Sequence, residues 1–275
     1  MPSVGLRPSL PWRREHTESP DREGLEGRVL LSRPIPSTAS SPSTAVEHPM
    51  ENRLVLGRKG SGKTSLTRSL APRWTRALLV DPFGEYADLC DAKVRTVPDL
   101  RDYLATTDGA WRVSYTTRNV REDFPVLCRC CMALGDCMLV VEETSQHCSA
   151  WRIGQEFLEL VEYGRHALEE ETGTAHPVGL VAMSRTPTEI HNIIRSQSWE
   201  MDCFALSEPA HLEWCAKVVS PEFALRVRDL DDSHYLSQNL VGARRPFEER
   251  VTDPAFRSRG YDGNRPTSGM SGAVV

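Results

Sequence analysis

Eight consecutive residues have the types and spacing that binding of nucleotide phosphates requires. The run Gly57-Arg58-Lys59-Gly60-Ser61-Gly62-Lys63-Thr64, which Ser65 follows, matches the pattern G-x-x-x-x-G-K-[ST] of a Walker A phosphate loop, or P-loop. Its glycines let backbone N–H groups turn toward phosphate oxygens, and a following helix adds the positive end of its dipole. We expect Lys63 to neutralise the β- and γ-phosphates and Thr64 to present its hydroxyl to Mg²⁺. The pattern predicts a site for a nucleoside triphosphate.

A second acidic element has the pattern expected at the end of a neighbouring strand. The apolar run Cys137–Val141 leads directly into Glu142 and Glu143. Mg²⁺ and an attacking water both need carboxylates opposite the phosphate loop. We expect Glu142 on the magnesium side, where Asp is more usual, and Glu143 beside the water. This order predicts a protein that hydrolyses its nucleotide.

The base and the reaction follow partly from absent motifs. The chain has no N-K-x-D or T-K-x-D to bind guanine and no L-S-G-G-Q of transporter ATPases, which favours ATP. A P-loop kinase is an alternative, although Glu142 and Glu143 argue against it because a positioned water would waste ATP. A nucleotide-gated interaction protein is another alternative, and it would bind ATP with negligible turnover.

The elements that would position these residues alternate between strand and helix. The strands read as continuous apolar runs, which is typical of a parallel sheet covered on both faces. Alternation of strands and helices predicts an α/β fold with the P-loop between the first strand and the first helix. The expected strands are Arg53–Leu56, Ala77–Asp81, Arg112–Tyr115, Cys137–Val141, Val178–Ser184 and Cys203–Leu206, and the expected helices are Thr64–Leu70, Asp99–Thr106, Phe124–Leu134 and Ile153–Leu168.

Several motifs occur in the order of a known family. Leu78–Tyr86 contains D-P-F-G-E-Y, which resembles the D-x-x-G-E-Y element of HerA-like ATPases in the HerA/FtsK superfamily. Gly164-Arg165-His166 resembles the family's G-R-[HK], and Val178–Ile190 resembles its next strand. That strand typically ends in T-Q-R-P, whereas this chain has Ser184-Arg185-Thr186-Pro187. Phe204–Leu212 resembles the closing strand and its Pro-led helix, so the likeness covers residues 50 to 220.

The resemblance implies a fold, an activity and partners. The fold would be the three-layer P-loop NTPase sandwich of the RecA/ASCE type, with a mostly parallel central sheet. The activity would be MgATP hydrolysis by a homo-oligomeric ring, usually a hexamer, that translocates double-stranded DNA. A core of this size is similar to viral genome-packaging ATPases, which would place a capsid or membrane complex among the partners. Plasmid-transfer ATPases and zonular-occludens-toxin-like assembly ATPases share the same core.

The resemblance and the order of the motifs also suggest roles for single residues. Arg165 would reach the γ-phosphate held by a neighbouring subunit, or alternatively would pair with Glu169 or Glu170. Ser184 or Arg185 would take over the γ-phosphate sensing of the missing glutamine. Asp81, at the tip of its strand, and Glu85 would border the nucleotide site.

Charge and cysteine content restrict the possible partners. The 275 residues contain 33 Lys and Arg against 38 Asp and Glu, a net charge of −5 that excludes DNA binding by bulk positive charge. Sequence-independent DNA binding would then rely on local phosphate contacts. The eight cysteines lie mostly in apolar segments, which favours reduced, packed thiols over a zinc site. The arginines that could contact DNA are Arg112, Arg118, Arg121, Arg226 and Arg228.

Composition also predicts the domain boundaries. Residues 1–49 are rich in proline and serine without core periodicity, so we expect a disordered leader, and Met50 as a possible start of translation. Residues 50–242 would form the ATPase domain and 243–275 a flexible tail. No apolar run approaches the roughly 18 residues that span a bilayer, and no secretory signal precedes the domain. We therefore expect a cytoplasmic protein, in the host cytoplasm or in the virion if it is viral.

Overall fold

The computed structural model describes residues 51–117, 119–166, 175–240 and 246–256. The expected leader, residues 1–49, lies outside the described residues, as does most of the expected tail. The strands are β1 Arg53–Leu56, β2 Arg76–Val80, β3 Ala92–Val94, β4 Trp111–Tyr115, β5 Cys137–Val141, β6 Cys148–Ser149, β7 Arg152–Ile153, β8 Val178–Ser184, β9 Glu200–Phe204, β10 His234–Asn239 and β11 Glu248–Val251. The α-helices are α1 Lys63–Leu70, α2 Val97–Thr106, α3 Val120–Leu134, α4 Gln155–Tyr163, α5 Asn192–Ser196, α6 Pro209–Val218 and α7 Pro221–Arg228, and short 3-10 turns are η1 Ala71–Arg73, η2 Thr144–Gln146, η3 Gly164–His166, η4 Pro187–Glu189 and η5 Pro254–Phe256.

Nine strands form one mostly parallel sheet in the order β11-β10-β9-β1-β8-β5-β2-β4-β3. Neighbouring strands from β9 to β3 pair in parallel, and β10 pairs antiparallel with both β9 and β11. The P-loop strand β1 therefore lies between β8 and β9, which are far away in sequence. The carboxyl ends of parallel strands share one edge, where such sheets bind ligands.

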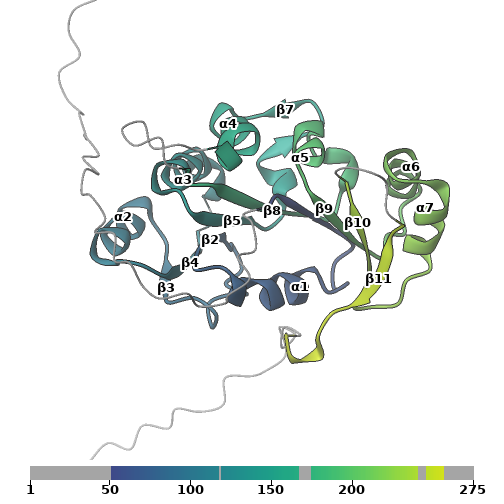
Figure 1. Cartoon of the computed structure of the whole chain (residues 1–275), viewed down its shortest axis with the longest axis horizontal. Helices are drawn as coiled ribbons and strands as arrows, with labels where there is room; N and C mark the ends of the chain where they lie inside the picture. Colours follow the sequence, from purple (N-terminus) through teal and green to yellow (C-terminus); the bar gives the residue numbers. More distant parts are fainter. Residues whose placement is uncertain (1–50, 118, 167–174, 241–245, 257–275) are drawn as a thin grey trace, which may run out of the picture. The chain divides into compact units, whose positions relative to one another are not determined.

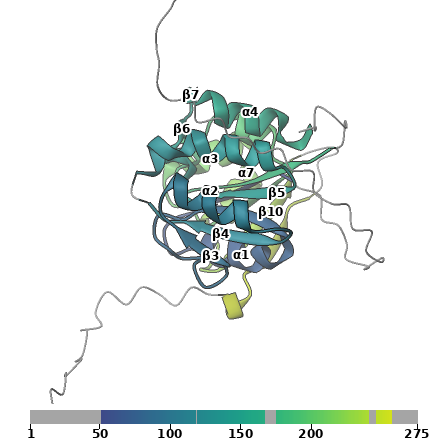
Figure 2. The same ribbon diagram turned by 90° about the vertical axis from the view of Figure 1, so that its left-hand side faces the viewer.

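Helices cover both faces of this sheet. Figure 1 shows α1 on one side and α3, α4 and α5 on the other. Alternate strand residues explain the two layers: Leu54 and Leu56 of β1 pack with the larger core cluster, and Val55 packs with Leu66 and Leu70 of α1. Figure 2 views the sheet from the edge that carries β3 and β4. The expected three-layer α/β fold with a mostly parallel sheet is confirmed.

Several element boundaries differ from the sequence prediction, and local contacts explain some of the differences. The last predicted strand, Cys203–Leu206, is instead Glu200–Phe204, because pairing with β1 starts at Glu200. The predicted helix Ile153–Leu168 begins only after Gly154 and ends at Tyr163. There Gly164 approaches the strand β8, since a Cβ at this residue would lie 2.9 Å from the Val178 carbonyl oxygen.

The sheet also extends beyond the expected end of the ATPase domain at residue 242. Strand β11 pairs with β10 in antiparallel register, from His234 opposite Val251 to Ser237 opposite Glu248. Residues 248–251, which lie within the expected tail, therefore belong to the sheet. The sequence did not predict this strand, because its residues are mostly charged and all of them are exposed at the edge of the sheet.

Most of the cysteine side chains pack in the hydrophobic core. Cys128, Cys131, Cys137, Cys203 and Cys215 are all buried in the larger core cluster. Burial raises the pKa of the Cys128 thiol far above its ordinary value. Among the described residues, no helix has both the length and the apolar character needed to cross a membrane.

Candidate active site

The P-loop links the end of β1 to the start of α1. Two backbone bonds hold it between the neighbouring strands: the Gly57 N–H donates to the Ser184 carbonyl at 3.2 Å, and the Arg58 N–H to that of Ala205 at 3.1 Å. Gly60 and Gly62 have positive φ values of 78° and 112°, which glycine adopts without strain. At these two positions the loop therefore has backbone conformations that favour glycine.

Lys63 curls back over this loop. Its ammonium donates to the carbonyl oxygens of Gly57 at 2.6 Å and Arg58 at 2.9 Å. The pKa of Lys63 is lowered to about 8, first by burial and then by the positive charge of Arg185. This ammonium group is poorly solvated, and it can exchange its carbonyl partners for phosphate oxygens.

Gly57 is the glycine with the least free space in the loop. A Cβ there would lie 2.5 Å from the Cβ of Phe204, and its φ of 151° disfavours other residues. We expect Gly57→Ala to lower the free energy of unfolding by about 2–4 kcal/mol. Urea denaturation measures this, with Gly154→Ala as the control, because a Cβ at Gly154 meets nothing within 4 Å. Equal losses in the two variants would contradict a steric requirement at Gly57.

Oxygen groups gather on the predicted magnesium side of the P-loop. The Thr64 hydroxyl lies 2.9 Å from Glu85 Oε2 and 3.4 Å from Glu142 Oε1, and the Tyr86 hydroxyl donates to Glu142 at 2.9 Å. The pKa of Glu142 is raised to about 8, first by burial and then by the charge of Glu85. One hydroxyl and two carboxylates are hard oxygen donors that fit Mg²⁺, whose charge would offset the crowding of these acids.

Asp81 holds the turn that delivers Glu85. Its buried carboxylate accepts the backbone N–H groups of Glu85 at 2.9 Å and Tyr86 at 3.0 Å, and the Ser114 hydroxyl at 2.9 Å. Gly84, with φ of 73°, allows the turn. The sequence placed Asp81 and Glu85 beside the site. In the structure Asp81 supports the turn, and Glu85 lies closer to the hydroxyl of Thr64 than Glu142 does.

Glu143 and Arg185 face each other from the ends of β5 and β8. Arg185 Nε lies 2.6 Å from Glu143 Oε2, and the Ser145 hydroxyl donates to Glu143 Oε1 at 2.8 Å. The Ser184 hydroxyl and the Arg185 backbone N–H approach the same oxygen at 3.4 Å. Glu143 has φ of 52°, a conformation that costs energy for residues with a side chain and that recurs at functional sites. The structure thus brings the predicted water-activating acid and the predicted γ-phosphate sensor together.

Arg165 lies far from this chain's own P-loop. It is an exposed residue of η3, and the adjacent Gly164 touches Val178 at the first residue of β8. The P-loop touches Ser184 at the last residue of that strand, and seven residues of strand span about 20 Å. Its alternative partners, Glu169 and Glu170, lie outside the described residues. An action of Arg165 on another subunit stays a prediction.

The loop before β10 contacts the P-loop, which the sequence did not reveal. The Ser233 N–H donates to the Ser61 carbonyl oxygen at 3.1 Å, and Arg58 pairs with Asp232 at 2.9 Å. Ser233 has a φ of 73°. Asp232 and Ser233 lie beyond the segment of family resemblance. The only sequence feature that could have suggested this contact is the acidic pair Asp231 and Asp232, which suits a basic loop.

The arginines considered for DNA binding have different surroundings. Arg226 pairs with Glu249, and Arg228 lies 2.8 Å from Asp229. Arg121 lines a cavity of about 550 Å³ beside the β6–β7 hairpin, whose tip carries Trp151, 91% exposed. Arg112 extends from β4, and Arg118 lies outside the described residues.

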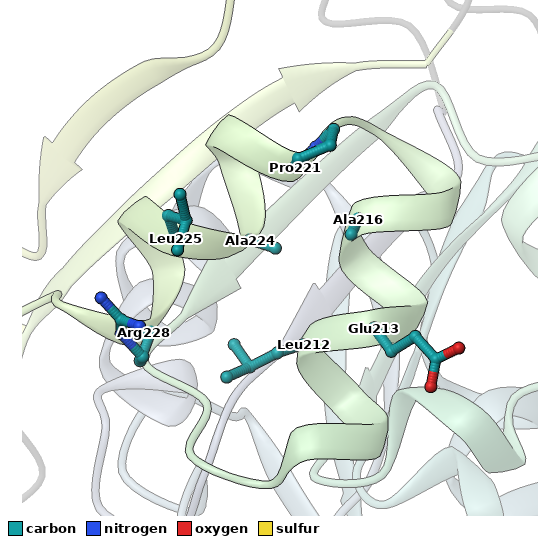
Figure 3. Close-up of a pocket in the computed structure, with 7 residues that line it drawn as sticks. All are labelled: Leu212, Glu213, Ala216, Pro221, Ala224, Leu225 and Arg228. Atoms are coloured by element: carbon teal, nitrogen blue, oxygen red, sulfur yellow. The ribbon is translucent and has the colours of Figure 1, made fainter.

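A second hollow, of about 330 Å³, lies between α6 and α7, away from the phosphate loop. Figure 3 shows its apolar lining, with Glu213 and Arg228 at its rim. No P-loop residue contributes to it, so it is not the candidate nucleotide site. It is lined by Leu212, Glu213, Ala216, Pro221, Ala224, Leu225 and Arg228.

A parallel sheet with a P-loop after β1 and acids after β5 defines the fold of a P-loop NTPase. No protein-family model matches the chain, and no curated protein matches its sequence. Solved structures share the fold. The genome packaging NTPase B204 from Sulfolobus turreted icosahedral virus 2, in complex with AMPPCP, is 20% identical, with a TM-score of 0.58 over 75% of this chain and 100% of that chain.

Two further B204 structures give similar values. The sulfate complex of the same NTPase has a TM-score of 0.60 at 20% identity and covers 75% of this chain and 98% of that one. The DNA-packaging ATPase B204 from Sulfolobus turreted icosahedral virus has a TM-score of 0.57 at 19% identity over 74% and 98%. At these identities the similarity is one of fold.

Proposed function

We propose that this protein is an ATP-hydrolysing, DNA-translocating motor of the HerA/FtsK type, which packages a viral genome into a capsid. The observation that carries the proposal is the convergence of Lys63, Thr64, Glu142 and Glu143 at one edge of the sheet. Further support comes from a fold shared over nearly the full length of solved genome-packaging NTPases, one of them bound to an ATP analogue.

The residues divide the reaction between them. Lys63 leaves the Gly57 and Arg58 carbonyl groups and neutralises the β- and γ-phosphates. Thr64 and Glu142, with Glu85 beside them, would hold Mg²⁺, which would supply electrostatic stabilisation of the phosphates. Glu143 orients a water for in-line attack on the γ-phosphorus, so that the bond to the β-phosphate oxygen breaks and ADP and phosphate leave.

We also propose how the protein assembles and what it binds. The active form is a homo-oligomeric ring, a hexamer by family resemblance, in which Arg165 serves the neighbouring subunit. The ring grips double-stranded DNA through its phosphates without reading bases. A capsid or membrane complex is the docking partner, and the cytoplasmic location remains a prediction. A plasmid-transfer or zonular-occludens-toxin-like assembly ATPase would use the same core.

Phosphate release measured with and without DNA tests this function. We expect MgATP turnover by the full chain, raised at least about fivefold by double-stranded DNA of any sequence, because the motor couples the two sites. Duplexes of unrelated sequence serve as matched controls. A P-loop kinase would release ADP only with a phosphate acceptor, and an interaction protein would bind ATP without turnover. Turnover that is indifferent to DNA would contradict translocation.

A further inference from the structure

Both oxygens of the Glu143 carboxylate have donor partners in the structure. Oε2 pairs with the Arg185 guanidinium at 2.6 Å, and Oε1 accepts from Ser145 at 2.8 Å, with the hydroxyl of Ser184 at 3.4 Å. The Glu143 side chain is only 13% exposed. A carboxylate whose two oxygens are already bound to donors is poorly placed to orient a water.

Arg185 is the more exposed member of the pair. Its side chain is 43% exposed, and it extends from the end of β8, beside the strand that carries the P-loop. Its charge contributes to lowering the pKa of Lys63, so the guanidinium lies within electrostatic reach of the phosphate-binding lysine. A guanidinium binds a carboxylate or a phosphate with the same donors and stays charged in both.

We propose that Arg185 exchanges partners when a nucleoside triphosphate binds, leaving Glu143 for the γ-phosphate. The exchange frees Glu143 Oε2 for the attacking water only when a γ-phosphate is present, so that a diphosphate leaves the acid engaged. Arg185 thereby acts as a positioning residue for Glu143, in addition to contacting the phosphate. This inference rests on the proposed function, because it requires ATP at the P-loop.

Nucleotide affinities of the full chain test the exchange, because breaking the ion pair must oppose binding of the triphosphate alone. With Mg²⁺ present, we expect Glu143→Gln to tighten binding of ATPγS about fivefold, an ordinary coupling between two sites, and to leave ADP binding unchanged. Arg185→Gln should weaken ATPγS binding and spare ADP. In the Arg185→Gln background, Glu143→Gln should no longer change the affinity for ATPγS.

The control variant removes a comparable ion pair elsewhere. Arg129 and Glu156 pair at 2.6 Å between α3 and α4, so Arg129→Gln should change neither affinity. Equal tightening by Glu143→Gln with and without Arg185 would overturn the exchange and assign the effect to repulsion between Glu143 and the phosphate. Absence of tightening would also overturn it. Failure of the parent protein to bind ADP or ATPγS would instead overturn the proposed function, and the exchange with it.

Discussion

Lys63→Ala is expected to abolish nucleotide binding or turnover, whereas Glu143→Gln is expected to keep binding and remove turnover. The two residues have different electrostatic tasks. Lys63 is a half-buried cation over the P-loop and compensates phosphate charge, so its loss leaves the phosphates without their main partner. Glu143 orients the water, and loss of such a group slows a reaction by about 10²–10⁴-fold.

Binding and turnover must be measured separately to distinguish these effects. Fluorescent nucleotide titration gives binding, and phosphate release gives turnover. Lys217→Ala and Glu156→Gln are matched controls. Each removes the same charge as the variant it is compared with, and both residues lie on helices outside the candidate site. Hydrolysis by Glu143→Gln at the parent rate would show that another group activates the water.

Mixtures of Lys63→Ala and Arg165→Ala subunits are expected to recover ATPase activity that each variant lacks alone. Arg165 is exposed and separated from its own P-loop by about the length of β8, roughly 20 Å, so it cannot serve that site directly. In a ring of head-to-tail contacts, about one quarter of the interfaces in an equal mixture would join an intact P-loop to an intact arginine. Guanidinium suits the task because it stays charged and can bridge two phosphate oxygens.

The mixing experiment requires evidence of co-assembly, which tagged subunits and sedimentation with ATP and DNA provide. A mixture of Lys63→Ala and Arg129→Ala subunits is the control for specificity, since Arg129 pairs with Glu156 within its own chain. In that mixture activity should match the fraction of Arg129→Ala subunits without further gain. Co-assembled rings that show no recovery would exclude the Arg165 assignment, and a chain that stays monomeric would exclude the ring.

The sequence by itself determined the fold class and the chemical elements of the site. Gly57–Thr64 gave the P-loop, because strand, glycine pattern and helix are adjacent in the chain. The apolar run before Glu142 and Glu143 located the second acidic element for the same reason. Continuous apolar strands separated by helices sufficed for a parallel sheet, since side-chain periodicity reports local burial.

Tertiary structure alone decided which of these residues meet. The order of the sheet places β8 directly beside β5, and thereby brings Arg185 to Glu143, 42 residues away. It turned Asp81 into the support of a turn and gave Glu85 the contact with Thr64. It also added the mostly buried strand β10 and, from exposed and mainly charged residues that carry no apolar pattern, the edge strand β11. Such long-range contacts depend on strand order and packing, whereas local sequence patterns specify only the elements themselves.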